Sequence, residues 1–175
     1  MSSKPKKGKV KKGGSKARPS KSSSSKRPPA PGAAAPTNVM PDYSALEEAR
    51  VFLHLVELTF TPHYATARDW YLGKFEAKDL ADFRNKYPDD SDEFARFWTV
   101  LGWFETAGVL MKNGRLNPDL FFQRFAVGPF WTKAKIVVHA LRKESGHKEL
   151  FEQFEWLVRR EQNWHKQQAR GSKSH

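Results

Sequence analysis

The sequence predicts an all-α protein: a single antiparallel, bundle-like domain of about six helices, preceded by a disordered basic arm. Two observations support this prediction. Every Phe, Trp and Tyr lies at or after Tyr43, so residues 1–40 have no large side chain whose burial would offset their chain entropy. After Tyr43, apolar residues recur at three- and four-residue steps between capping residues and prolines, which is typical of amphipathic helices.

Charge divides the chain at the same place. The chain has 31 Lys and Arg against 19 Asp and Glu, a net charge of +12. Eleven of the cations and none of the acids precede residue 37, whereas residues 41–165 hold 17 cations and 19 acids. We therefore expect three parts: a disordered arm and linker rich in Lys, Ser, Gly and Pro at residues 1–40, a slightly acidic helical domain at 41–165, and a disordered basic tail at 166–175.

The expected helices begin at Ser44. Ser44 and Glu47 have the spacing of a capping box, in which each side chain accepts a hydrogen bond from the other residue's amide. This first helix reaches about Thr61, and Pro62 suits the first turn of a second helix that runs to about Gly73. One apolar stripe follows the first helix at helical spacing: Leu46, Ala49, Leu53, Val56 and Phe60.

A third, more polar helix is expected over residues 77–86, ended by the Tyr87-Pro88 pair. The strongest helix signal follows, with a cap at Ser91 and with Glu93 near the positive end of the helix dipole. Six residues give this fourth helix a wide apolar face: Phe94, Phe97, Trp98, Leu101, Phe104 and Leu110.

The exit from the fourth helix has two interpretations, because Asn113-Gly114 lies between apolar residues. Asn-Gly is a strong hairpin signal, and a hairpin after a helix would resemble the wing of a winged-helix DNA-binding domain. Alternatively, Gly114 ends the helix as a left-handed cap. We favour the cap, because the sequence shows no partner strands and a lone two-stranded ribbon is marginally stable.

The remaining helices are expected over residues 117–125, 128–141 and 147–164. Asn117-Pro118 provides a cap and a first turn for the short one, and Gly128-Pro129 begins the next. The last helix is expected to fray after Trp164.

The arm is the clearest functional feature. A polycation without acids can follow phosphates and release their condensed counterions, but without aromatic side chains it cannot stack on bases. We therefore expect non-specific, salt-sensitive association with nucleic acid (RNA, ribosome or DNA) or another polyanion, while the helical domain contacts a protein partner. The candidate nucleic-acid-binding residues are Lys4, Lys6, Lys7, Lys9, Lys11, Lys12, Lys16, Arg18, Lys21, Lys26 and Arg27.

Two alternatives remain for the arm. It is a solvated spacer for a protein-protein interaction module, or it associates peripherally with an anionic membrane surface. The chain shows no apolar signal region, lipidation motif or run of about 20 apolar residues, so we expect a soluble cytoplasmic protein without a transmembrane segment. The absence of cysteine excludes disulfides, thiolate nucleophiles and Cys-based zinc sites.

A metal site or an active site is not expected. A carboxylate-bridged dimetal site needs Glu-x-x-His on each of two helices, and that order does not occur among the candidates. The candidates are His54, Glu57, Glu105, His139 and Glu155. No nucleophile or catalytic carboxylate pair is evident either, so we expect a protein that is not an enzyme and has no cofactor.

Two further features are interpreted as structural or as interface signals. Glu105 interrupts an apolar face, where a carboxylate is best tolerated in an ion pair; Arg142, or as the alternative Arg124, is the expected partner. Of the six Trp residues, Trp103 and Trp164 are expected to be partly exposed and are interface candidates.

From Phe94 to Arg160 the order of features resembles a mainly bacterial and archaeal family of small helical domains of unknown function. The resemblance implies an antiparallel helical fold in which Glu105, Arg142 and Glu155 belong to the framework. Some such relatives are membrane-anchored, whereas this chain has a basic arm in place of a transmembrane segment. The resembling stretches are residues 97–105 (FWTVLGWFE), 108–114 (GVLMKNG), 117–120 (NPDL), the Trp131 helix ending at Leu141-Arg142, and 154–157 (FEWL).

Overall fold

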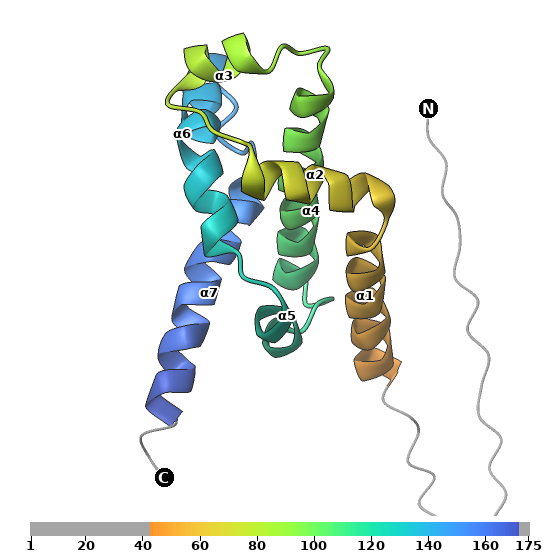
Figure 1. Ribbon diagram of the computed structural model, residues 1–175. Helices are drawn as coiled ribbons and strands as arrows, with labels where there is room; N and C mark the ends of the chain where they lie inside the picture. Colours follow the sequence, from red (N-terminus) through yellow and green to blue (C-terminus); the bar gives the residue numbers. More distant parts are fainter. Residues whose placement is uncertain (1–42, 172–175) are drawn as a thin grey trace, which may run out of the picture. The chain divides into compact units, whose positions relative to one another are not determined.

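The computed structural model describes residues 43–171, which form seven α-helices and no strand. The all-helical prediction is confirmed. The seven helices within this range correspond to the seven segments expected from the sequence, one more than the bundle of about six, and the two short ones each have their own side-chain cap. The helices are α1 (Tyr43–Thr59), α2 (Pro62–Gly73), α3 (Leu80–Lys86), α4 (Asp92–Lys112), α5 (Pro118–Arg124), α6 (Gly128–Ser145) and α7 (Glu152–Gly171) (Figure 1).

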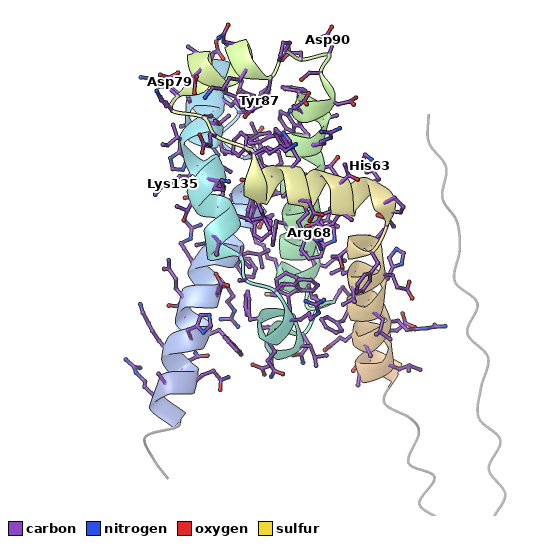
Figure 2. All side chains as sticks on the ribbon, in the orientation of Figure 1. His63, Arg68, Asp79, Tyr87, Asp90 and Lys135 are labelled. Atoms are coloured by element: carbon purple, nitrogen blue, oxygen red, sulfur yellow. The ribbon has the colours of Figure 1, made fainter. Side chains whose placement is uncertain are left out.

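Most helices begin where a polar side chain satisfies the first free amides. Thr61 accepts from the Tyr64 amide at the start of α2, and Ser91 accepts from the Phe94 amide at the start of α4. At the start of α3, the Asp79 side chain accepts from the Asp82 amide, and at its end the Tyr87 amide donates to the Phe83 carbonyl. Both residues are labelled near the top of Figure 2. These caps explain why the helix starts follow so closely from the sequence.

Gly114 ends α4 in a left-handed conformation, with φ of 67°. The Gly114 amide donates to the Met111 carbonyl at 3.1 Å, and the Arg115 amide donates to the Leu110 carbonyl at 2.8 Å. This pair of bonds is the Schellman motif, which satisfies the last carbonyls of a helix. The hairpin alternative is therefore wrong: residues 109–116 contain no strand.

Several expected boundaries differ from the structure. α3 begins at Leu80 rather than at residue 77, α6 continues to Ser145 rather than ending at residue 141, and α7 begins at Glu152 rather than at residue 147. The first helix is described from Tyr43, so Ser44 lies inside its first turn rather than at its cap. α7 continues to Gly171, beyond the domain end expected at residue 165, so residues 166–171 are helix and not tail. Gln, Lys, Arg and Ala dominate this last stretch, and all four favour helix even where no face is buried.

α4 is the central helix. It contacts α2, which crosses it, and α7, whose first turns pack against its second half (Figure 1). The rings of Phe104 on α4 and Phe154 on α7 stack with centroids 4.7 Å apart. The largest fully buried side chains are mostly aromatic: Tyr71, Phe75, Phe83, Phe97, Phe104, Phe121 and Phe154. Aromatic packing thus supplies most of the core.

Two glutamates each bind the N-terminus of a neighbouring helix. The Glu105 carboxylate on α4 accepts hydrogen bonds from the Gln153 and Phe154 amides of α7, at 3.2 and 2.8 Å. The buried Glu161 carboxylate on α7 accepts from the Val127 and Gly128 amides at the start of α6, both at 2.8 Å. A helix N-terminus has free amides and a positive dipole end, so it neutralises a carboxylate much as a cation does.

The expected ion pair between Glu105 and Arg142 is wrong for this reason. Glu105 is already satisfied by α7, and the Arg142 Nη1 instead donates to the Glu155 carboxylate at 2.6 Å. The Arg142 Nε also donates to the Leu150 carbonyl at 2.8 Å, which fixes the connection between α6 and α7. All three residues implied by the resemblance therefore take part in joining α4, α6 and α7.

Gly108 allows α4 and α7 to approach closely. A Cβ atom at Gly108 would lie 2.6 Å from the Gln153 carbonyl oxygen, a backbone atom that cannot move alone. Gly102, two turns earlier on α4, has no atom within 4 Å of such a Cβ.

Replacing Gly108 with Ala is expected to lower the free energy of unfolding by about 1–3 kcal/mol, because the methyl group forces α7 away from α4. The matched change Gly102→Ala adds the same methyl group in open space and is expected to raise stability by up to about 1 kcal/mol, since Ala favours helix over Gly. Urea unfolding followed by circular dichroism measures both. Equal effects of the two changes would contradict the close contact.

The pair of Glu155 with Arg142 predicts a dependence of stability on pH. Partial burial alone would raise the pKa of Glu155, but the hydrogen bond and charge of Arg142, with Arg159 and His139 nearby, outweigh it and hold this pKa below its ordinary 4.5. A lowered pKa contributes stability that is present above the ordinary value and lost as the pH falls through the folded-state value.

Glu155→Gln is therefore expected to lower stability at neutral pH by about 1–3 kcal/mol and to flatten its decline below the ordinary pKa. Thermal unfolding measured across the acid range tests this, with the exposed Glu152→Gln as a control that should keep the wild-type slope. An unchanged slope in the Glu155 variant would count against the pair.

Candidate functional site

The eleven cations expected to bind nucleic acid, Lys4 to Arg27, lie outside the described residues. Candidate sites within residues 43–171 are therefore surfaces of the helical domain. Two features qualify: an apolar face of α1 and a cleft beside α4.

α1 is apolar on two faces. Its inner face packs on the core through Val51, Phe52 and the buried Leu55. The Phe52 ring contacts that of Phe125, which follows α5, with centroids 6.5 Å apart. In the view of Figure 1, α1 lies at one edge of the domain, and α6 and α7 lie at the other.

The outer face of α1 carries large apolar side chains in solvent. Leu46, Leu53 and Phe60 are 53%, 56% and 70% exposed, and Ala49 and Val56 between them are half-buried. Phe60 directly follows α1, and its amide donates to the Glu57 carbonyl at 3.0 Å, so the last turn carries it onto the same face. These five residues are called the α1 seam: Leu46, Ala49, Leu53, Val56 and Phe60.

The α1 seam is the apolar stripe that the sequence predicts, but it is not the face that packs on the core. The core contacts come from Val51, Phe52 and Leu55, which lie about a third of a turn away around the helix. An apolar helix face that no neighbour covers is a recognised interaction surface, because isolated domains rarely leave several large apolar side chains aligned in water.

Charged residues border the seam on one side. The Arg50 guanidinium lies 3.3 Å from the Glu47 carboxylate, and the His54 Nδ1 lies 3.7 Å from the Glu57 carboxylate. All four side chains are mostly exposed, so these pairs stabilise the helix only slightly and rearrange easily.

The cleft lies between α3, α4 and the α6–α7 connection and has a volume of about 570 Å³, within the usual range for small-molecule sites. Trp98, Leu141 and Leu150 form its apolar part. At its rim, Arg84 on α3 donates two hydrogen bonds, of 2.9 and 2.6 Å, to the Glu144 carboxylate at the end of α6. This ion pair therefore forms part of the lining of the cleft.

The rim carboxylates are poor candidates for general acids. The hydrogen bond from Arg84, with its charge, lowers the pKa of Glu144. The pKa of Glu149 is lowered by its own backbone amide and by His147, whose Nδ1 lies 2.9 Å away. A general acid at neutral pH needs a raised carboxyl pKa, and both shifts go the other way.

The residues considered as metal ligands do not converge. His54 and Glu57 lie on exposed α1, while Glu105 binds the start of α7. His139 Nε2 is 4.0 Å from the Glu155 carboxylate, which Arg142 already occupies. Within residues 43–171, no group of three or more His, Asp and Glu residues could hold a metal ion.

The tryptophan prediction is half right. The prediction for Trp103 is wrong, because its side chain is only 7% exposed. α5 and Phe125 pack against it, and the centroids of the Trp103 and Phe125 rings lie 5.0 Å apart. Trp164 is half-buried as expected, and its indole Nε1 donates to the Asp119 carboxylate at 2.6 Å, which ties α7 to α5.

Sequence reasoning found the residues of the α1 seam but missed their exposure. No local signal reveals this exposure, because spacing in steps of three and four predicts an apolar helix face without showing which neighbour covers it. None of the helices in the described part of the chain is long and apolar enough to cross a membrane.

Comparison with known proteins identifies the domain but not its activity. No curated protein and no solved structure matches the chain. The family known as a domain of unknown function (DUF4760) matches residues 45–161, from the first turn of α1 to Glu161 on α7. Because this match covers more than half of the chain and includes the three joining residues Glu105, Arg142 and Glu155, the chain belongs to the DUF4760 family of domains of unknown function.

Proposed function

We propose that this chain is a non-enzymatic, cytoplasmic binding protein. Its basic arm, residues 1–40, associates with nucleic acid (RNA, ribosome or DNA) without sequence specificity, while the helical domain contacts protein. The observation that carries the proposal is the separation of charge: eleven cations and no acid precede residue 37, and the domain has nearly equal numbers of both. Phosphate binding by such a segment depends on charge density rather than on a folded site.

Several cations of the helical domain already bind groups within the domain, which supports the arm as the segment that binds phosphate. The Lys133 amine donates to the Tyr71 and Leu72 carbonyls near the end of α2, at 3.0 and 2.9 Å. Lys86 binds the Asp82 carboxylate at 2.9 Å. Cations that neutralise helix ends and carboxylates have less to offer a phosphate chain, so the arm is the favoured contact.

The α1 seam supports the protein-contacting role of the domain. Protein interfaces are built around large apolar side chains that are surrounded by polar residues, and the seam has this composition. An anionic membrane surface fits α1 less well, because membrane-surface helices are rich in Lys and Arg on the polar face. α1 has Arg50 as its one cation, against Glu47, Glu48 and Glu57.

Four arm substitutions test the nucleic-acid role against four matched substitutions in the domain. Full chains labelled for fluorescence anisotropy are titrated with structured RNA at salt concentrations from about 50 to about 200 mM, where counterion release changes affinity most steeply. The arm variant replaces Lys4, Lys7, Lys11 and Lys16 with Gln. The control variant replaces four exposed domain lysines with Gln: Lys78, Lys135, Lys143 and Lys148.

The wild type is expected to lose affinity steeply with salt, because each neutralised phosphate releases counterions. The arm variant is expected to bind at least about tenfold more weakly, and its salt slope should be smaller by about one unit for each phosphate that it no longer neutralises. The domain control should behave as the wild type. Equal weakening in both variants, or unchanged affinity in the arm variant, would remove the arm from the proposal.

A further inference from the structure

We propose that the protein contacted by the helical domain is a second copy of this chain, through antiparallel pairing of the two α1 seams. This inference rests on the proposed function, since it names the partner for the domain's protein-contacting role.

The spacing of the seam favours a helical partner. Its five residues, from Leu46 to Phe60, follow one another in steps of three, four, three and four. That average of 3.5 residues keeps an apolar line facing another helix along its whole length, which is the pattern of helices that pair side by side. Among the helices of residues 43–171, α1 is the one that carries several large exposed apolar side chains in line, so a matching partner is α1 of another copy.

The charges beside the seam favour the antiparallel direction. Arg50 and Glu57 directly follow Ala49 and Val56, so they lie on one flank of the seam. The opposite flank holds Phe52 and Thr59, which turn toward the core. In a parallel pair, the flank of each helix that holds Arg50 and Glu57 would face the partner's flank that holds Phe52 and Thr59. Neither of those two residues carries a charge, so no ion pair would form between the helices.

In an antiparallel pair, by contrast, the two charged flanks face each other. Arg50 of each copy then lies opposite Glu57 of the other, which gives two equivalent ion pairs around a twofold axis. Both residues now make only exposed pairs with Glu47 and His54 on their own helix, and such pairs cost little to exchange.

The other occupants within the chain fit less well. Residues 1–40 contain no aromatic side chain, so they offer little to cover the large apolar side chains of the seam. The seam, from Leu46 to Phe60, is shorter than the 17 residues of α1, so its pairing buries less than a standard interface of about 1,600 Å². A weak, concentration-dependent dimer is therefore expected, with two arms available to one polyanion.

Sedimentation velocity of the full, nuclease-treated chain tests the pairing at protein concentrations from about 1 to about 200 µM, the range suited to a small interface. The wild type is expected to shift toward a dimer as concentration rises. Leu53→Glu, at the exposed centre of the seam, should remain monomeric over the same range. Leu120→Glu places the same charge on an exposed leucine of α5 and should dimerise as the wild type. Circular dichroism confirms that each variant is folded.

A charge exchange tests the direction. Arg50→Glu and Glu57→Arg should each weaken the dimer, because like charges then face each other, and the double variant should restore it. A double variant as weak as the single ones would overturn the antiparallel direction. A wild type that stays monomeric, or a Leu53→Glu variant that dimerises normally, would overturn the pairing itself. Leu53-dependent binding of a monomeric wild type to anionic vesicles would also overturn it.

Failure of this inference and failure of the proposed function are separable. RNA titrations of the Leu53→Glu variant are expected to show binding that is weakened by loss of the second arm but still strongly dependent on salt. If dimerisation fails while arm-dependent RNA binding persists, the pairing alone is wrong. If dimerisation holds while the arm substitutions leave RNA binding unchanged, the nucleic-acid role is wrong.

Discussion

The Glu105 carboxylate holds the first turn of α7 against α4 through the Gln153 and Phe154 amides, and Gly108 leaves the space for that contact. The positions of the later helices follow from it. Once α7 begins there, Glu155 in the same turn reaches Arg142 on α6, and Glu161 reaches the amides that begin α6. Hydrogen bonds to charged groups contribute about 1.5–3 kcal/mol each. The contacts of Glu105, Glu155 and Glu161 are therefore a large part of the free energy of unfolding of a domain of this size.

The same three contacts make the interior of the domain a poor place for proton-transfer chemistry. Glu105, Glu155 and Glu161 are each bound to an amide or a guanidinium, and the carboxylates at the cleft rim are held ionised by Arg84 and by local hydrogen bonds. Groups committed in this way serve architecture more readily than proton transfer. Binding is therefore expected at the surface, where α1 packs on the core by one face and presents the other to solvent.

Local signals predicted the helices well, because the caps act within a few residues. Thr61, Ser91 and Asn117 each bind amides two or three positions ahead, and Gly114 ends its own helix. Such chemistry can be read without knowing the fold. The extension of α7 to Gly171 also follows from helix propensity, because Gln, Lys, Arg and Ala favour helix beyond the last apolar residue.

The errors concern partners that are distant in sequence. Glu105 needed a counter-charge, but a helix N-terminus 48 residues away supplied it in place of a cation, and no local pattern distinguishes the two. Trp103 was expected at the surface because nothing in its own helix shows that α5 covers it. The two apolar faces of α1 could not be ranked for burial, since burial depends on where α4 and α5 lie.

The central claim is that two parts of the chain bind different partners: the basic arm binds a polyanion, and the helical domain contacts protein. Lysine acetylation footprinting of the full chain, with and without structured RNA, tests it most directly, because every lysine reports its own protection by mass spectrometry. The account predicts that RNA protects the arm lysines, such as Lys6, Lys12 and Lys21, and leaves Lys135 and Lys148 on the domain equally reactive. Protection concentrated on the domain, with the arm lysines unchanged, would contradict it.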